Sequence, residues 1–547
     1  MKNLDRTRII FIAIVGVALL VVCGAVAFNL ARDFFTGDEA TPTAAVAIST
    51  LAPGAPTPAV SLESPPAVHA IGYNPAQPAD NLPIYTCGAD AFGSYFTLQQ
   101  MQMSGKDVAH GFHLAIVPFE LDGDPTYSVS EEQRTALLNS GQWDCLLTTL
   151  DSVALTSPGV ITAIVDESAG ADQLWGRDVA TVNDLKGKRV TFSRGSVGEY
   201  FLYYTLSIAG LSPISDVTLV PQDGVAEAVA TFNAGEADAV SGWEPDIYEA
   251  ESGGGVPLLS SNQMRIVIDV MVTSRQSIAN KADLVHSFHD AWFDTLKAQV
   301  ENLETAAAQI AEWGHNDWSF VYPDTASDDL RAWLGSVAQA DLGDNAFVMR
   351  DTRPIINRLQ IARRVWAAAG ATVPGDNVEE LINPGFVNRS AAQASLQANG
   401  NPVNDTFSIS SSLDLSGVST TDAETLAVLP CRTFAFLPES TELTLESRRI
   451  LDSCVVPTLT QSVGLFLRVK GSSAWPGPAG AFTQEEILAF AEARAQSVVD
   501  YLVLQGIDPA RFIVEATLPP QDHWETEDAE LQAQDRYVEM TLITVGR

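Results

Sequence analysis

Apolar and polar positions follow two alternating patterns along residues 81–387. Short apolar runs rich in β-branched residues, such as 160–168 and 265–274, are typical of buried strands. Segments with helical spacing separate these runs, and the longest of them covers 281–314. Strands that alternate with helices predict an α/β fold with largely parallel sheets. Because the region is long for one hydrophobic core, the pattern also indicates two lobes.

Residues 421–547 carry a shorter pattern that predicts a separate α+β domain. Its order is strand, helix, strand, helix, strand, strand, and the second helix, at 483–506, is the most regular element. Two stretches without periodicity, 37–80 and 388–420, are rich in Pro, Ala, Ser, Thr and Asn and are typical of linkers.

The N-terminal segment, residues 1–36, has the pattern of a membrane anchor. Ile9–Phe28 is an uncharged apolar run long enough to span a bilayer as a helix. Lys2, Arg6 and Arg8 precede this run, so the positive-inside bias keeps the N-terminus in the cytoplasm. We therefore expect a single-pass protein of the cell membrane, with its bulk outside the cytoplasm.

Two other readings of the same segment stay open. Ala25, Val26 and Ala27 fit the small-residue site of a cleaved signal peptide. Cys23 is a candidate for lipidation, although Val22 before it is larger than such a site prefers. Each reading places most of the chain outside the cytoplasm.

Composition narrows the possible partners. The 68 acidic and 31 basic residues give a net charge of −37, and no stripe of Lys or Arg is present. Nucleic-acid binding is therefore not expected, since contacts to phosphates need clustered positive charge. The cysteines beyond Cys23 favour the disulfide pairs Cys87–Cys145 and Cys431–Cys454, one pair in each half of the chain, as an exported protein allows.

Polar side chains gather where predicted strands give way to turns. The candidate ligand-binding residues of this kind are Thr148, Thr149, Asp151, Asp166, Ser168, Trp243 and Glu244. Open α/β sheets bind ligands at the carboxyl ends of their strands, so these positions predict one cleft.

The same series of motifs resembles a known family. Four motifs, taken in order, are similar to those of the solute-binding proteins of ABC importers for nitrate, taurine, alkanesulfonates and thiamine-precursor pyrimidines. The motifs are GQWDCLLTTLDSVAL, AIVDESAGAD, KRVTFSRGSVGEYF and SGWEPD. The resemblance implies a periplasmic-binding-protein type II clamshell over 81–387. Lobe 1 would comprise about 81–165 and 270–387, lobe 2 about 166–269, and hinge crossings would lie near Val165–Ser168 and Ile266–Ser274.

The resemblance also adds residues to the expected cleft. These are the first-strand loop Gly88, Ala89 and Asp90 and the turn Gly195, Ser196 and Val197. Ser196 and Glu199 fit a capping box at the start of a helix. With Arg194 as the sole base nearby, the acids of the cleft favour a ligand with an amine or amide end, and a sulfonate-like ligand is the alternative.

An enzyme is the competing interpretation. The chain contains no G-x-S-x-G, P-loop, H-E-x-x-H or G-x-G-x-x-G motif. His286 and His289, followed by Asp290, lie one helical turn apart, but we expect ordinary surface and core positions rather than metal ligands. We therefore expect no catalysis, cofactor or metal, with a pyrimidine-synthesising enzyme of the same fold as the alternative.

The C-terminal region resembles the peptidoglycan-binding domains of the OmpA/MotB type. The strongest match is ARAQSVVDYLVLQGIDPARF, in which Arg494 occupies the place of the arginine that holds a stem-peptide carboxylate. The family's G-H-T-D run is replaced by 471–474, so its aspartate is Ala474 here. The resemblance implies contact with peptidoglycan, which the missing aspartate puts in doubt.

These features together predict a membrane-tethered receptor. It would capture a small molecule outside the cytoplasm for an ABC permease or a sensor and contact the cell wall through its C-terminal domain. A structural protein of the envelope with a degenerate ligand site is the alternative.

Overall fold

The computed structural model describes residues 81–119, 129–313, 320–397, 403, 407 and 423–545. The predicted membrane segment and the first linker lie outside these residues, and so does most of the second linker. Within the described ranges, no helix is both long and apolar enough to cross a bilayer.

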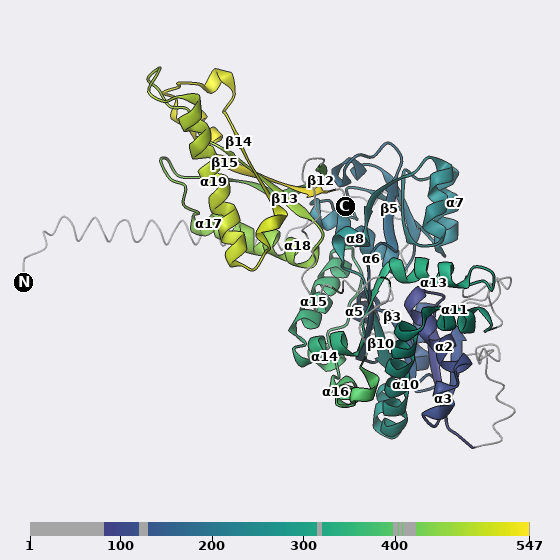
Figure 1. Ribbon diagram of the computed structural model, residues 1–547. Coiled ribbons are helices and arrows are strands. Elements are labelled where there is room, and N and C mark those ends of the chain that lie inside the picture. Colours follow the sequence, from purple (N-terminus) through teal and green to yellow (C-terminus); the bar gives the residue numbers. More distant parts are fainter. Residues whose placement is uncertain are drawn as a thin grey trace, which may run out of the picture. The chain divides into compact units, whose positions relative to one another are not determined.

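A six-stranded mixed sheet organises the first lobe (Figure 1), in the order β11-β4-β10-β3-β1-β2. β1 runs parallel to β2 and β3, whereas β10 is antiparallel to both β3 and β4. All residues of β4 and β10 are buried, which explains their nearly continuous apolar runs. The strands are Ile84–Ala89 (β1), His113–Pro118 (β2), Cys145–Thr149 (β3), Val160–Ser168 (β4), Ile268–Thr273 (β10) and Val337–Gln339 (β11).

A five-stranded sheet organises the second lobe, in the order β7-β6-β8-β5-β9. β6 is parallel to β7 and β8, and β5 is antiparallel to β8 and β9. Its strands are Asp172–Gly176 (β5), Arg189–Ser193 (β6), Thr218–Gln222 (β7), Ala239–Trp243 (β8) and Val256–Ser260 (β9). All five lie within 166–269, the range that the sequence assigned to lobe 2.

The chain passes between the two sheets twice. β4 leads through 169–171 into β5, and the short helix α8 (Ser261–Met264) leads from β9 back to β10. Because β4 leaves the first sheet and β10 returns to it, the two strands are antiparallel neighbours. The expectation of largely parallel sheets is therefore wrong, since these connecting strands make both sheets mixed.

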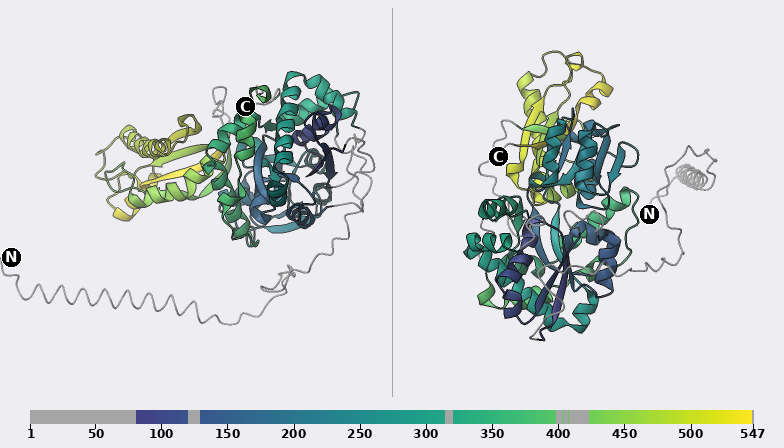
Figure 2. Two further views of the ribbon diagram at one scale, coloured as in Figure 1. Left: turned by 90° about the horizontal axis from the view of Figure 1, so that it is seen from below. Right: turned by 90° about the vertical axis from the view of Figure 1, so that its right-hand side faces the viewer.

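Helices cover both sheets of the binding region, and the two views of Figure 2 show them on either side of the strands. The predicted long helix 281–314 is divided at Asn302, whose side chain accepts a hydrogen bond from the Thr305 amide and begins a new helix. The helices are Thr97–Met103 (α2), Lys106–Ala109 (α3), Glu131–Asn139 (α4), Leu150–Thr156 (α5), Val197–Ile208 (α6), Val225–Asn233 (α7), Arg275–Asn280 (α9), Ala282–Glu301 (α10), Leu303–Ala311 (α11), Ala326–Gly335 (α13), Leu342–Arg350 (α14), Arg353–Ala368 (α15) and Gly385–Ala391 (α16).

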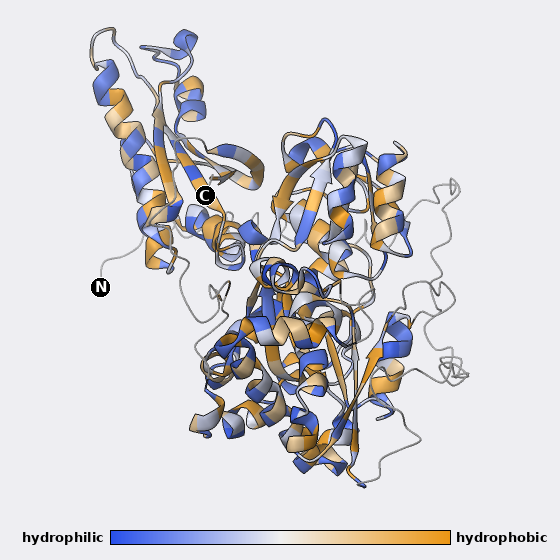
Figure 3. Ribbon diagram, turned by 45° about the vertical axis from the view of Figure 1, so that its right-hand side comes forward, coloured by the Kyte–Doolittle hydropathy of each residue, from blue (hydrophilic) through white to orange (hydrophobic). Residues whose placement is uncertain are grey.

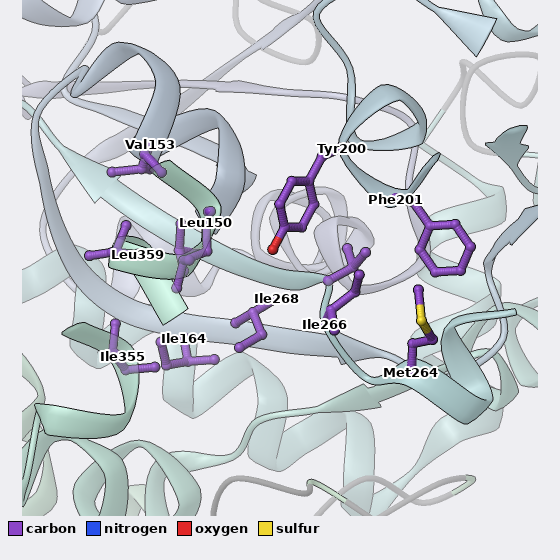
Figure 4. Packing of buried hydrophobic residues seen from close by; sticks show 14 of the residues in the cluster. Leu150, Val153, Ile164, Tyr200, Phe201, Met264, Ile266, Ile268, Ile355 and Leu359 are labelled. Carbon is purple, nitrogen blue, oxygen red and sulfur yellow. The ribbon is translucent and has the colours of Figure 1, made fainter. Parts of the chain in front are cut away.

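The core of the binding region joins elements that are distant in sequence. Figure 4 shows Leu150 of α5, Ile164 of β4, Tyr200 of α6, Ile268 of β10 and Leu359 of α15 within one apolar cluster. In Figure 3 the strands are mostly apolar, while the helices carry both apolar and polar positions. This distribution is what the periodicity of the sequence predicted.

The C-terminal region has the predicted order of strands and helices except for one helix, α20, which lies between the last two strands and was not predicted. Its sheet has the order β12-β15-β13-β14, with β13 and β14 parallel and the other pairs antiparallel. The elements are Glu424–Ala435 (β12), Leu445–Ile450 (α17), Val456–Gln461 (α18), Phe466–Ser472 (β13), Gln484–Leu504 (α19), Phe512–Thr517 (β14), Ala529–Asp535 (α20) and Tyr537–Thr544 (β15).

Two disulfides are present, and they join the pairs that the sequence favoured. Cys87–Cys145 links neighbouring positions of β1 and β3. Cys431–Cys454 links β12 to the π-helical turn Leu451–Val455.

Candidate ligand-binding cleft

A cavity of about 100 Å³ is lined by residues of both lobes. The first lobe contributes the loop after β1, the end of β3 and the helix α4, and the second contributes the starts of β5 and α6 and the end of β8. Carboxyl ends of parallel strands therefore meet at this cavity. The lining residues are Asp90, Phe92, Tyr95, Phe119, Glu131, Arg134, Leu147, Thr148, Thr149, Ser152, Asp172, Gly195, Ser196, Val197, Trp243, Val267 and Asp269.

Seven of the thirteen ligand-binding candidates line this cavity. They are Asp90, Thr148, Thr149, Gly195, Ser196, Val197 and Trp243. The other six candidates, Gly88, Ala89, Asp151, Asp166, Ser168 and Glu244, do not line it. The residues that sequence reasoning missed come mainly from α4, from the loop after β1 and from Asp172 and Asp269.

Gly88 has a packing role. A Cβ atom at this position would overlap the indole ring of Trp143. Trp143 in turn stacks on Phe119, whose ring lines the cavity, with ring centroids 6.2 Å apart. The glycine thus allows Trp143 to pack closely against β1, behind the residues that line the cavity. It does not contact the cavity itself.

The turn before α6 differs from the predicted capping box. The Ser196 hydroxyl donates to the Ser193 carbonyl at 2.7 Å and makes no bond to the amides of the first helical turn. The Glu199 side chain instead accepts from the Gly195 amide and the Tyr203 hydroxyl, each at 2.6 Å. The capping box is therefore wrong, because the carboxylate reaches past Ser196 to the turn.

Buried carboxylates lie beside the cavity at the crossing strands. Asp166 of β4 and Asp269 of β10 are paired neighbours in the sheet, and Asp269 accepts a hydrogen bond from the Tyr95 hydroxyl. Neither oxygen of Asp166 has a hydrogen-bond partner of good geometry among the described residues, and the same holds for Oδ1 of Asp172. The nearby hydroxyls of Ser94 and Ser168 lower the pKa of Asp166 and of Asp172, respectively, but burial outweighs them. The three aspartate side chains are at most 3% exposed.

Burial raises the pKa of each of these carboxyl groups. The pKa of Asp166 rises to about 7, first through burial and then through the charges of Asp172 and Glu167. The pKa values of Asp172 and Asp269 are also well above their usual range, with burial as the largest cause. The charge of Asp166 raises the pKa of Asp269 further, and the charge of Asp269 raises the pKa of Asp172 further.

Glu167 shows that neighbouring acids along β4 have different surroundings. Its carboxylate lies 3.4 Å from Nη1 of Arg265 and 3.8 Å from Nη2 of Arg358. Side chains alternate along a strand, so these arginines neutralise Glu167 and not Asp166.

Arg134 of α4 is the basic residue that lines the cavity. Its guanidinium lies 3.7 Å from the centroid of the Phe119 ring, and its Nε donates to the Val129 carbonyl at 2.7 Å. Its Nη1 lies 3.5 Å from the Glu131 carboxylate. The expectation that Arg194 supplies the nearest base is wrong, since that side chain is exposed and does not line the cavity.

Glu244 forms a contact between the lobes. Its carboxylate accepts hydrogen bonds from the hydroxyl of Ser336, between α13 and β11 of the first lobe, and from the hydroxyl of Tyr248 at 3.0 Å. Burial raises the pKa of Glu244, while both hydrogen bonds act in the opposite direction. This residue thus holds the two lobes together rather than facing the cavity.

Asp151 and His289 lie in the core, whereas His286 is half-buried. Asp151 is buried on α5, where burial raises its pKa to about 7. His289 is buried, its Nδ1 lies 2.8 Å from the Val285 carbonyl, and burial lowers its pKa to about 4. His286 contacts the Phe386 ring. Across the described ranges, no group of three or more His, Cys, Asp and Glu side chains is arranged to hold a metal ion.

Arg494 is enclosed by the C-terminal domain. It is 1% exposed, and its guanidinium donates to the carbonyls of Ser440, Ser472 and Leu437 at 3.1, 3.1 and 3.4 Å. Burial lowers its pKa to about 10. Ala474, at the place of the absent aspartate, is also buried.

Comparison with known proteins finds similarity in the binding region. Residues 160–306 match the family described as NMT1/THI5 like. A segment of 127 residues, 20% of this chain, is 33% identical to a protein of Escherichia coli (strain K12) named as an aliphatic sulfonates-binding protein. The match spans 39% of that protein's own length.

Two solved structures resemble the binding region at low identity. The alkanesulfonate-binding protein of Xanthomonas axonopodis pv. citri, bound to MOPS, is 18% identical, with 55% of this chain and 98% of that chain covered and a TM-score of 0.43. A desulfurization enzyme is also 18% identical, with coverage of 57% and 99% and a TM-score of 0.38.

Proposed function

We propose that this protein is a solute-binding receptor that works outside the cytoplasm. Its binding region would capture a small organic molecule, with an amine, amide or sulfonate-like group, between two lobes and present it to an ABC permease or a sensor. The observation that carries the proposal is the cavity lined by both lobes, between which the chain crosses twice. Closure of the lobes around a solute would shift the population from open to closed forms.

The similarity to an aliphatic sulfonates-binding protein supports this class of function. The sequence of the N-terminal segment supports a membrane tether, with Ile9–Phe28 as the single span. A receptor fixed to the membrane by one helix and a linker would stay close to its permease. It would therefore deliver the bound solute over a short distance.

Thermal unfolding of the full chain in a mild detergent tests the proposal. A bound solute raises the melting temperature by an amount that grows with the logarithm of its concentration relative to Kd. The probes are ethanesulfonate, taurine, 1,4-diaminobutane and agmatine. Trp243→Ala, which removes a cavity wall, is expected to abolish the response, while Trp524→Ala in the C-terminal domain is expected to keep it.

The outcomes separate a receptor from a structural protein. A rise of the melting temperature that Trp243→Ala removes supports the receptor. A chain that responds to none of these probes, or whose response is the same in Trp243→Ala, contradicts it and favours an envelope protein with a degenerate site.

We also propose that the C-terminal domain contacts peptidoglycan, as its OmpA-like sequence suggests. Because Arg494 is enclosed by three carbonyls, its substitution would disturb the domain itself as well as any contact with the wall. Sedimentation of the full chain with purified sacculi is the test, with Arg494→Ala compared with the exposed Arg449→Ala. Absence of the unaltered chain from the pellet, or equal sedimentation of both variants, contradicts the proposal.

A further inference from the structure

The cleft contains more buried carboxyl groups than the basic residues around it can balance. Asp172 lines the cavity, is 2% exposed, and its Oδ1 has no hydrogen-bond partner of good geometry among the described residues. Asp269 lines the same cavity and accepts one hydrogen bond from Tyr95. Asp166 lies directly beside Asp269, is fully buried, and lacks a described partner of good geometry for either oxygen.

The nearby arginines do not neutralise these carboxylates. Arg265 and Arg358 pair with Glu167, on the other side of β4. Arg134 is the sole base among the cavity-lining residues, and it is engaged by Glu131 and by the Phe119 ring. An ionised carboxylate that is buried without a partner is costly, so these side chains are suited to receive positive charge from outside the chain.

Aromatic side chains complete a surface for an organic cation. Phe92, Tyr95 and Trp243 line the same cavity, and the rings of Phe92 and Tyr95 meet edge to face with centroids 5.6 Å apart. Ring faces attract ammonium and amidinium groups and also cover an aliphatic chain. Neutral hydroxyls for further hydrogen bonds come from Thr148, Ser152 and Ser196.

We propose that the solute carries a protonated amine or amidine, which binds to the carboxylates of Asp172 and Asp269. This inference rests on the proposed receptor function and names the chemical class of its ligand. An ammonium group offers three donors, which would satisfy the free oxygen of Asp172 and the remaining acceptors of Asp269. A group that is only anionic, such as a simple sulfonate, would be repelled at this end of the cleft.

The raised pKa values of the three carboxyl groups agree with this assignment. Without a cation, burial favours their protonated forms. A bound ammonium would lower these pKa values again, so binding is expected to release protons and to strengthen as the pH rises from 6 to 8.

Taurine and ethanesulfonate provide a matched test, since they differ in one amino group. Titration calorimetry on the full chain at pH 8 would compare these two with 1,4-diaminobutane and agmatine. We expect at least one amine to bind at least 10-fold more tightly than ethanesulfonate. We expect Asp172→Asn to weaken that binding at least 10-fold, and the exposed Asp223→Asn of the same lobe to leave it unchanged.

The ligand-free protein gives a second measurement that needs no bound probe. Asp172→Asn removes a carboxyl group that the folded chain at pH 8 must either bury as an ion or keep protonated, and both states cost free energy. The substitution is therefore expected to raise the melting temperature of the ligand-free chain at pH 8, while Asp223→Asn is not. A fall or no change in Asp172→Asn contradicts the inference, because the carboxylate would then already be balanced within the chain.

The failures of the two proposals are distinguishable. Tight binding of ethanesulfonate without any amine overturns the cationic ligand and leaves the receptor in place. A response to Mg²⁺ or Ca²⁺ with none to the amines also overturns the inference. Absence of all binding, together with an unchanged melting temperature in Asp172→Asn, overturns both.

Discussion

Arg265 at the return crossing gives the most direct test of how the hinge is stabilised. It is 1% exposed, and its guanidinium lies 3.4 Å from the fully buried carboxylate of Glu167. Arg358 supplies a second positive charge at 3.8 Å and also donates to the Arg265 carbonyl at 2.8 Å. Arg265→Met keeps an unbranched apolar stem at this position and removes the guanidinium group with its charge and donors.

The magnitude follows from burial. Removal of one partner from a buried ion pair costs about 3–5 kcal/mol, because the remaining charge stays away from water. Since Arg358 still faces Glu167, we expect a loss near the lower end, about 3 kcal/mol. For a binding region of about 300 residues, that loss lowers the melting temperature by roughly 5 °C.

Scanning calorimetry or circular dichroism of the full chain measures the unfolding of the binding region. Arg353→Met is the matched control, because Arg353 also pairs with a carboxylate, that of Asp351, but is largely exposed. Its melting temperature is expected to equal that of the unaltered chain. Adding Glu167→Gln to Arg265→Met is expected to recover part of the loss. A melting temperature of Arg265→Met within about 1 °C of the control would refute the reasoning, because it would show that Glu167 is compensated without Arg265.

Three further predictions concern closure, packing and pH. Ser336→Ala removes the hydroxyl that donates a hydrogen bond from the first lobe to Glu244 of the second. A hydrogen bond to a charged group contributes about 1.5–3 kcal/mol, so we expect solute binding measured by calorimetry to weaken roughly 10–100-fold. Unchanged affinity would show that this bond does not support closure. Gly471→Ala is expected to destabilise the C-terminal domain by about 1–3 kcal/mol, because the new Cβ would overlap the Ala491 carbonyl oxygen. Its proteolysis should then be faster than that of the unaltered chain, and an equal rate would contradict this. Burial raises the pKa of Asp151 to about 7 in the folded chain, whereas an aspartate in the unfolded chain has a pKa of about 4. The folded form therefore binds more protons between these values, and stability falls as the pH rises from about 4 to 7. Melting temperatures of Asp151→Asn over that range should show a smaller fall, and an identical profile would contradict the assignment.

The site shows clearly where sequence reasoning succeeded and where it stopped. Thr148, Thr149 and Trp243 could be placed at the cleft because they end strands, and the ends of parallel strands meet at one edge of a sheet. Arg134 carries no such signal, since it lies on an ordinary helix that reaches the cavity only through tertiary packing. Asp166 and Glu167 are adjacent acids at the end of one strand, and only the structure shows that arginines accompany the second and not the first.

The turn before α6 gives the same lesson on a smaller scale. Ser196 and Glu199 have capping-box spacing, yet the carboxylate binds the Gly195 amide and the Tyr203 hydroxyl instead. The spacing of residues shows which hydrogen-bond donors the Glu199 carboxylate could reach. Which of these donors it binds depends on the backbone geometry of the turn, which the sequence pattern does not contain.

The sequence by itself determined the alternation of strands and helices in the binding region and most of the order of elements at the C-terminus. These features follow from periodicity and turn residues, which act over a few positions of the chain. The tertiary structure alone decided the mixed pairing of both sheets, the engagement of Arg494 by three carbonyls and the meeting of Asp172 with Asp269. The reason is physical: the charge balance of a buried site is the sum over all side chains that surround it, and these come from distant segments of the chain, such as those of Tyr95 and Asp269, which are 174 positions apart.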